Sequence, residues 1–209
     1  MNYEESPQKQ INSVIALFSD GQIQEALDSV RSLIKDYPNE PVPYNISGAC
    51  YAALGQLDEA VKNYEKSLTI KPDYAEAHNN LGGTLQELGQ LDAAFKCYEK
   101  ALAIKPDYAE AHNNLGNALK ERGQLNAAVK CYEKVLAIKP DYVEVHNSLG
   151  ITLQDLGQLN AAVKSYEEVL AIKPDFAEMH NNLGVVFQEL DQLDAAVKSF
   201  EKALAIKPD

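Results

Sequence analysis

Histidine is a common metal ligand and general base, and four histidines recur at even intervals in this sequence of 209 residues. They are His78, His112, His146 and His180, each 34 residues after the one before it. A zinc site would need the ring nitrogens within about 2 Å of one ion. Equivalent residues of a repeating helical structure lie on different helices, about 10 Å apart. We therefore expect the histidines to be packing residues, and we predict neither a metal nor a cofactor.

The remaining reactive side chains form no catalytic pattern. Cys97 and Cys131 are also 34 residues apart, which places them on neighbouring helices rather than in a metal knuckle. A serine, histidine and aspartate set would have to recur in every repeat, whereas a catalytic site occurs once in a molecule. The glycines are too widely spaced for a phosphate-binding loop. We therefore predict that the protein is not an enzyme, and the odd number of cysteines favours a reduced, cytoplasmic setting.

Asparagine is the polar residue whose placement most needs an explanation. It recurs in the middle of predicted helices, where it is less favourable than alanine by roughly half a kcal/mol. An amide side chain carries both a donor and an acceptor, so it can pair with a peptide bond of any sequence. A row of amides could then hold an extended chain by its backbone. The asparagines in question are Asn79, Asn80, Asn113, Asn114, Asn147, Asn181 and Asn182.

All of these residues follow one internal period of 34 residues. Residues 75–108 match residues 109–142 at 27 of 34 positions. The same period relates a series of glycines and a series of prolines, which are Gly48, Gly82, Gly116, Gly150 and Gly184, and Pro72, Pro106, Pro140, Pro174 and Pro208. A fixed period of this length is typical of stacked helical hairpins.

Within one repeat, the apolar spacing predicts two helices. Apolar residues three or four apart, starting at Ala77, predict a first helix that ends near Gly89, a residue suited to a left-handed C-cap. A second apolar stripe ends at Pro106. Asp73 and Glu76 have the spacing of a capping box, so we expect them to cap the first helix. Each helix would be about 13 residues or about 20 Å long, and the hairpins must stack because one hairpin alone leaves an apolar stripe uncovered.

Counted from residues 41, 75, 109, 143 and 177, most repeats have Leu and Gly at positions 7 and 8, Ala at 20, an aromatic residue at 24, a small residue at 27 and Pro at 32. This pattern resembles the tetratricopeptide repeat family. The resemblance implies an all-α, right-handed superhelical solenoid of antiparallel helix pairs. Five tandem repeats are predicted at residues 41–74, 75–108, 109–142, 143–176 and 177–209. Residues 1–40 are predicted to form an N-terminal tail and a degenerate capping repeat.

The resemblance further implies that positions 2, 5, 6, 9, 12 and 13 of each first helix face a concave groove. The asparagines at positions 5 and 6 are similar to the asparagine ladder in the superhelical arm of O-linked N-acetylglucosamine transferase, although Ser148 interrupts one rung. Alternatively, these asparagines have a structural role and form hydrogen bonds within one repeat or between neighbouring repeats. The implied residues for binding a peptide or partner are Asn79, Asn80, Asn113, Asn114, Asn117, Asn147, Asn181, Asn182, Gln86, Lys120, Gln154 and Gln188.

Charge and hydropathy narrow the class of partner. The net charge of −12 disfavours nucleic acid, and no apolar run is long enough for membrane insertion. Glutamate at position 2 of four repeats disfavours an acidic peptide tail. We therefore predict a non-catalytic protein–protein interaction scaffold that binds an extended peptide or partner segment in its concave groove.

Two other functions fit the same residues. The chain could be the substrate-recruiting arm of a larger transferase, of the glycosyl- or sulfotransferase type, that is truncated after Asp209. It could also be a self-associating array, in which copies join weakly end to end through an uncapped C-terminal helix. An apolar helix face would otherwise stay open to water in such an array.

Overall fold

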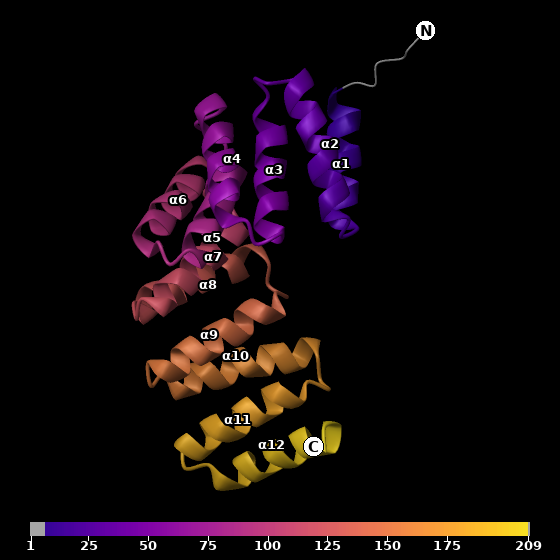
Figure 1. Ribbon diagram of the computed structural model, residues 1–209. Coiled ribbons are helices and arrows are strands. Elements are labelled where there is room, and N and C mark those ends of the chain that lie inside the picture. The colour runs from indigo at the N-terminus through magenta and orange to yellow at the C-terminus, as the bar shows by residue number, and fades with distance from the viewer. Residues whose placement is uncertain (1–6, 209) are drawn as a thin grey trace. The chain divides into compact units, whose positions relative to one another are not determined.

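The computed structural model describes residues 7–208, and these residues form antiparallel pairs of α-helices without any strand (Figure 1). In chain order the helices are α1 (Pro7–Ser19), α2 (Ile23–Asp36), α3 (Pro41–Ala53), α4 (Leu57–Ile70), α5 (Ala75–Glu87), α6 (Leu91–Ile104), α7 (Ala109–Glu121), α8 (Leu125–Ile138), α9 (Val143–Asp155), α10 (Leu159–Ile172), α11 (Ala177–Glu189) and α12 (Leu193–Ile206). The predicted all-α array of helical hairpins is confirmed. None of the helices in residues 7–208 is both long and apolar enough to cross a membrane.

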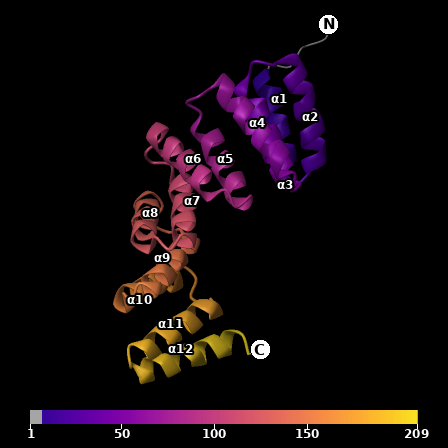
Figure 2. The same cartoon turned by 60° about the vertical axis from the view of Figure 1, so that its left-hand side comes forward.

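The chain consists of two compact units, the first ending at Tyr108 and the second beginning at Ala109. In each unit, a second helix packs against the first helix of its own pair and against the first helix of the pair that follows. Figure 2 shows the packing within a pair for α11 and α12, which lie side by side. In the first unit, first helices of consecutive pairs also contact each other, α1 with α3 and α3 with α5, so they share one side of that unit.

The two helices of a pair cross closely at a glycine. A Cβ atom added at Gly82 would lie 2.6 Å from Cε1 of Tyr98, and one added at Gly150 would lie 2.5 Å from Cε1 of Tyr166. The tyrosine rings fill the crossing and are buried, with 1% of Tyr98 and 0% of Tyr166 exposed. This contact explains why the glycine and the aromatic residue recur together in every good repeat.

The turn inside each pair contains a left-handed residue, as predicted for Gly89, whose φ is +73°. The corresponding residue of the last pair is Asp191, whose φ is +58°. Within residues 7–208 it is the only residue other than glycine with a positive φ. A side chain disfavours this conformation, so the last turn is strained.

The predicted capping box is wrong. Helix α5 begins after Tyr74, which is its N-cap residue, and no side chain caps it. Asp73 therefore lies one residue too early to cap the helix. The backbone of Tyr74 is extended, its ring is half-buried, and Nζ of Lys71 lies 5.2 Å from the ring centroid. Glu76 is in the first turn, where a carboxylate interacts favourably with the helix dipole.

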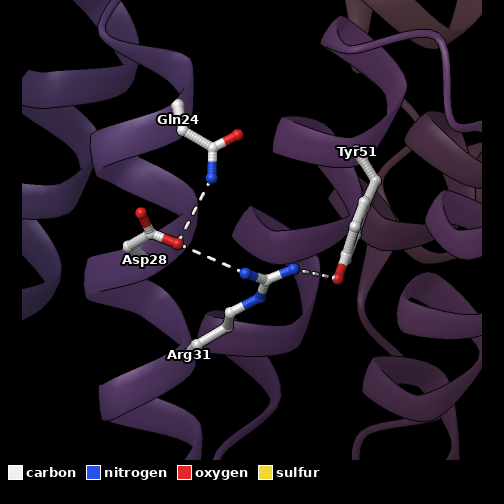
Figure 3. A network of polar contacts seen from close by, with 4 residues as sticks. All are labelled: Gln24, Asp28, Arg31 and Tyr51. Atoms are coloured by element: carbon white, nitrogen blue, oxygen red, sulfur yellow. Dashed lines mark hydrogen bonds and ion pairs between the residues drawn. The ribbon is translucent and has the colours of Figure 1, made fainter.

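The N-terminal pair, α1 and α2, folds although its repeat pattern is degenerate. Val14 and Val30 replace the crossing glycine and the aromatic residue, and both lie in its core with 3% and 0% exposed. A polar network ties α2 to α3 (Figure 3). In this network the guanidinium of Arg31 donates to Oδ1 of Asp28 at 3.2 Å and to the hydroxyl of Tyr51 at 3.0 Å.

The outward face of α12 is apolar and exposed. Leu193 and Val197 are 59% and 53% exposed, and Leu204 is 60% exposed. The residues at the first two of these positions in α10, Leu159 and Val163, are half-buried, and α10 packs against α11. An apolar helix face is therefore open on the second unit, and association of copies through it stays a prediction.

Candidate partner-binding surface

Two of the residues predicted to bind a partner, Asn80 and Gln154, form hydrogen bonds between neighbouring first helices. In the first unit, Nδ2 of Asn80 on α5 donates to Oδ1 of Asn45 on α3 at 3.2 Å. In the second unit, Nε2 of Gln154 on α9 donates to Oε1 of Glu189 on α11 at 2.6 Å. These bonds place predicted site residues on the shared side of the first helices.

We call this side the inner face, and define it as positions 5, 6, 9 and 12 of the first helices. In α3 and α5 of the first unit its amide residues are Asn45, Asn79, Asn80 and Gln86. In the second unit it comprises Asn113, Asn114, Asn117, Lys120, Asn147, Ser148, Ile151, Gln154, Asn181, Asn182, Val185 and Gln188.

The inner-face asparagines of α3 and α5, in the first unit, are largely covered by neighbouring residues. Asn79 is 6% exposed and Asn45 is 9% exposed. Asn80 is half-buried and uses its amide group to bond Asn45, which agrees with a structural role between repeats for this residue. These asparagines of α3 and α5 therefore offer a partner little exposed amide surface.

The position-5 asparagines are more accessible in the second unit. Asn113 and Asn147 are half-buried, and Asn181 is exposed. The amide oxygen of Asn147 is buried and has no hydrogen-bond partner among the described residues. An unsatisfied buried acceptor costs about 1–3 kcal/mol, so a donor that reached it would be stabilising. The other predicted residues of this unit are half-buried (Asn114, Asn117, Lys120, Gln154 and Asn182) or exposed (Gln188).

The core tyrosines reach the inner face from beneath, which the sequence analysis did not predict. In each case the phenol hydroxyl donates to an amide oxygen of the same repeat. The three pairs are Tyr98 with Gln86 at 2.9 Å, Tyr132 with Asn117 at 2.8 Å and Tyr166 with Gln154 at 3.3 Å. The co-occurrence of tyrosine at position 24 with an amide at position 9 or 12 is the sequence signal that could have found them.

These hydrogen bonds orient the amides. Burial raises the pKa of Tyr132 and Tyr166 to about 12, so both hydroxyls stay protonated and keep donating near neutral pH. The amide of Gln154 is held at both ends, because its oxygen accepts from Tyr166 and its nitrogen donates to Glu189. A glutamine held in this way has lost most of its rotational freedom before any partner arrives.

Three of the four histidines tie a first helix to the loop before it. The ring Nε2 atoms contact proline carbonyl oxygens, in the pairs His78 with Pro72 at 2.9 Å, His146 with Pro140 at 2.7 Å and His180 with Pro174 at 2.9 Å. In residues 7–208 no group of three histidine, cysteine, aspartate or glutamate side chains is arranged to hold a metal ion. Burial raises the pKa of the Cys97 and Cys131 thiols, which makes them poor nucleophiles at neutral pH.

Comparison with known protein families finds one repeat along most of the chain. Models described as tetratricopeptide repeat match residues 42–107, 73–141, 131–164 and 177–209, and a model described as TPR repeat matches residues 152–191. No curated protein matches the chain by sequence.

Several solved structures share the fold. PilF of Pseudomonas aeruginosa superposes with a TM-score of 0.84 at 17% identity, over 97% of this chain and 92% of that one. YrrB, described as a TPR protein with an unusual peptide-binding site, gives a TM-score of 0.76 at 22% identity, over 86% of this chain and 93% of its own. MamA gives a TM-score of 0.73 at 27% identity, over 77% of this chain and 94% of its own.

Proposed function

This chain belongs to the tetratricopeptide repeat family, and we propose that it holds an extended segment of a protein partner against the inner face of its second unit. Proteins built from these repeats are generally non-catalytic scaffolds. The observation that carries the proposal is the set of oriented amides on the first helices, of which Gln154 is the clearest case.

Oriented amides suit the recognition of a peptide backbone. A peptide bond presents one N–H donor and one carbonyl acceptor, and an amide side chain presents the matching groups. Because bonds to Tyr166 and Glu189 already hold the Gln154 side chain, a partner that binds there loses less free energy to side-chain ordering. The second unit is favoured over the first because Asn147 and Asn181 are more exposed than Asn79.

The unpaired oxygen of Asn147 supports the same reading. It lacks a donor within the described residues, and a backbone N–H of a bound segment would supply one. The oxygen is buried, so the amide has to turn outward about its terminal torsion, which is a soft rotation. The likeness in fold to YrrB, whose description names a peptide-binding site, is consistent with this use of the repeats.

Selection from a random-peptide library tests the proposal. The chain is compared with a variant carrying Asn147→Ala and Asn181→Ala, and with a control carrying Asn126→Ala and Asn160→Ala, two exposed asparagines of α8 and α10. Circular dichroism and thermal unfolding establish that all three proteins keep their helices.

We expect the inner-face variant to retain at most about a fifth of the affinity for the selected peptides, since each of the two lost amide contacts removes about 0.5–1.5 kcal/mol. The control should bind as the parent does. Equal binding by all three proteins would contradict the proposal, as would equal losses in both variants.

A further inference from the structure

Carboxylates border the inner face of the second unit at both ends of every first helix. The first turns of α7, α9 and α11 contain Glu110, Glu144 and Glu178, and the last residues of these helices are Glu121, Asp155 and Glu189. All six side chains are exposed. The two rows stand about 16 Å apart, because eleven residues of α-helix rise about 1.5 Å each.

Positive charge is scarce between these rows. Lys120 is the only basic residue at the twelve positions that define the inner face of the second unit. Within the described part of the chain, Glu144 and Glu178 form no ion pair. Glu76 of the first unit shows how such a carboxylate behaves beside a cation, since its Oε1 lies 3.4 Å from Nζ of Lys105. The first-turn row of the second unit therefore presents carboxylates that a cationic partner could pair with.

The middle of the same surface is apolar on two neighbouring helices. Ile151 on α9 is half-buried, and Val185 on α11 is 36% exposed. Both residues occupy position 9, seven residues after the first-turn carboxylate and four residues before the last-residue carboxylate of their helices. A partner that fits this surface carries apolar side chains along its centre and cationic side chains toward its edges.

The spacing of the helices also fits an extended partner. A polyproline II segment turns the same side toward a surface at every third residue, about 9 Å along its axis. Packed helices lie about 8–10 Å apart. The hydrogen bond from Gln154 on α9 to Glu189 on α11 brings these two helices within side-chain reach of each other. Apolar side chains three residues apart would thus meet Ile151 and Val185 in turn, while long cationic side chains three residues apart, which share another side of the segment, reach toward the first-turn carboxylates.

We infer that the second unit selects extended segments in which an apolar residue recurs at every third position and lysine or arginine recurs at every third position between them. This inference rests on the proposed function and names the chemistry of its partner. Charge would then select the sequence of the partner, while the amides contact the peptide backbone, which is the same in any sequence.

Designed peptides test the inference directly. The probe is acetyl-(Leu-Arg-Pro)4-amide, and its matched controls replace every arginine by glutamine or by glutamate. Affinities are measured by fluorescence anisotropy with the full chain at low and at raised ionic strength. We expect the arginine peptide to bind about tenfold more tightly than the glutamine peptide and the glutamate peptide to bind most weakly, with the preference shrinking as salt screens the charges.

Two variants of the chain test which carboxylates cause the preference for the arginine peptide. The inner variant carries Glu110→Gln, Glu144→Gln and Glu178→Gln, and the outer control carries Glu133→Gln, Glu167→Gln and Glu201→Gln on the exposed surface of α8, α10 and α12. Both remove the same charge. The inner variant should lose about tenfold in affinity for the arginine peptide, and the outer control should lose at most about twofold.

The outcomes separate this inference from the proposed function. Equal affinity for the three peptides would overturn the inference and leave backbone recognition standing. Equal losses in the inner and outer variants would overturn it as well, because net charge alone would then explain the preference. Failure of all three peptides to bind would overturn both the inference and the function on which it rests.

Discussion

The hydroxyl of Tyr98 donates a hydrogen bond of 2.9 Å to Oε1 of Gln86, so a residue in the core of a helix pair orients a side chain on the inner face. The same relationship links Tyr166 to Gln154. In the last pair phenylalanine takes the place of the tyrosine, as Phe200, and Gln188 is exposed. Core packing and surface chemistry are therefore coupled in the three pairs from α5 to α10 and uncoupled in the last.

Restoring the hydroxyl in the last pair should stabilise the protein. The ring of Phe200 lies against Gly184 as the tyrosine rings lie against their glycines, so Phe200→Tyr places a donor beneath Gln188. We expect the free energy of unfolding to rise by about 0.5–1.5 kcal/mol, the net value of one hydrogen bond, measured by urea denaturation. The gain should shrink when Gln188→Ala is also present, and an undiminished gain would show that the bond is not its source.

Two adjacent glycines of α5 should respond to alanine with opposite signs. A Cβ atom at Gly82 would lie 2.6 Å from the ring of Tyr98, whereas the nearest atom to one at Gly83 is 3.9 Å away. We expect Gly82→Ala to destabilise the protein by about 1–3 kcal/mol through overpacking. Gly83→Ala should stabilise it by about 0.5–1 kcal/mol, because alanine is the better helix residue. Thermal unfolding of both variants tests the two predictions. An equal loss of stability in the two variants would contradict the close helix crossing at Gly82.

The strained turn of the last pair should be relieved by glycine. Asp191 has φ +58°, whereas the corresponding residue in the turn of each other pair is a glycine with φ between +71° and +77°. We expect Asp191→Gly to stabilise the protein by about 0.5–1 kcal/mol. Asp191→Ala is the control, since alanine has a Cβ atom without the local hydrogen bonding of aspartate, and it should be destabilising. A lower melting temperature for the glycine variant would contradict the claim that the turn at Asp191 is strained.

Alkaline pH should weaken the fold through the core tyrosines. Burial raises the pKa of Tyr132 and Tyr166 from 10.0 to about 12, so the folded state binds the phenol protons more tightly than the unfolded state does. The stability that this supplies is fully present below about pH 10 and is lost as pH rises toward about 12. Urea denaturation at several pH values measures the decline. The double variant Tyr132→Phe, Tyr166→Phe should lose less stability as pH rises. An unchanged decline would contradict its assignment to these two tyrosines.

Periodicity explains how much of the fold could be predicted from the sequence. The spacing of Gly82, Gly89 and Pro106 predicts where helices cross, turn and end, because each of these residues acts through its own backbone or its lack of a side chain. The capping box failed because α5 begins one residue later than Asp73 would require, after the extended backbone of Tyr74.

The candidate site was less predictable, because it depends on contacts between residues far apart in the chain. Asn79 and Asn181 occupy the same position of their repeats, yet the first is covered and the second is exposed. The pairing of Asn80 with Asn45 joins neighbouring repeats and leaves no trace in a single repeat. The link from Tyr98 to Gln86 crosses from one helix of a pair to the other, so helical spacing alone does not reveal it.

The central claim is that the inner face of the second unit binds an extended segment through its amides. The most direct test is to record the side-chain amide resonances of assigned asparagines and glutamines by NMR while a library-selected peptide is added. The account predicts that the signals of Asn147, Asn181 and Gln188 shift in a saturable manner, while those of the exposed Asn126 and Asn160 stay in place. Saturable shifts confined to Asn126 and Asn160 on the second helices, with the inner-face amides unmoved, would contradict it.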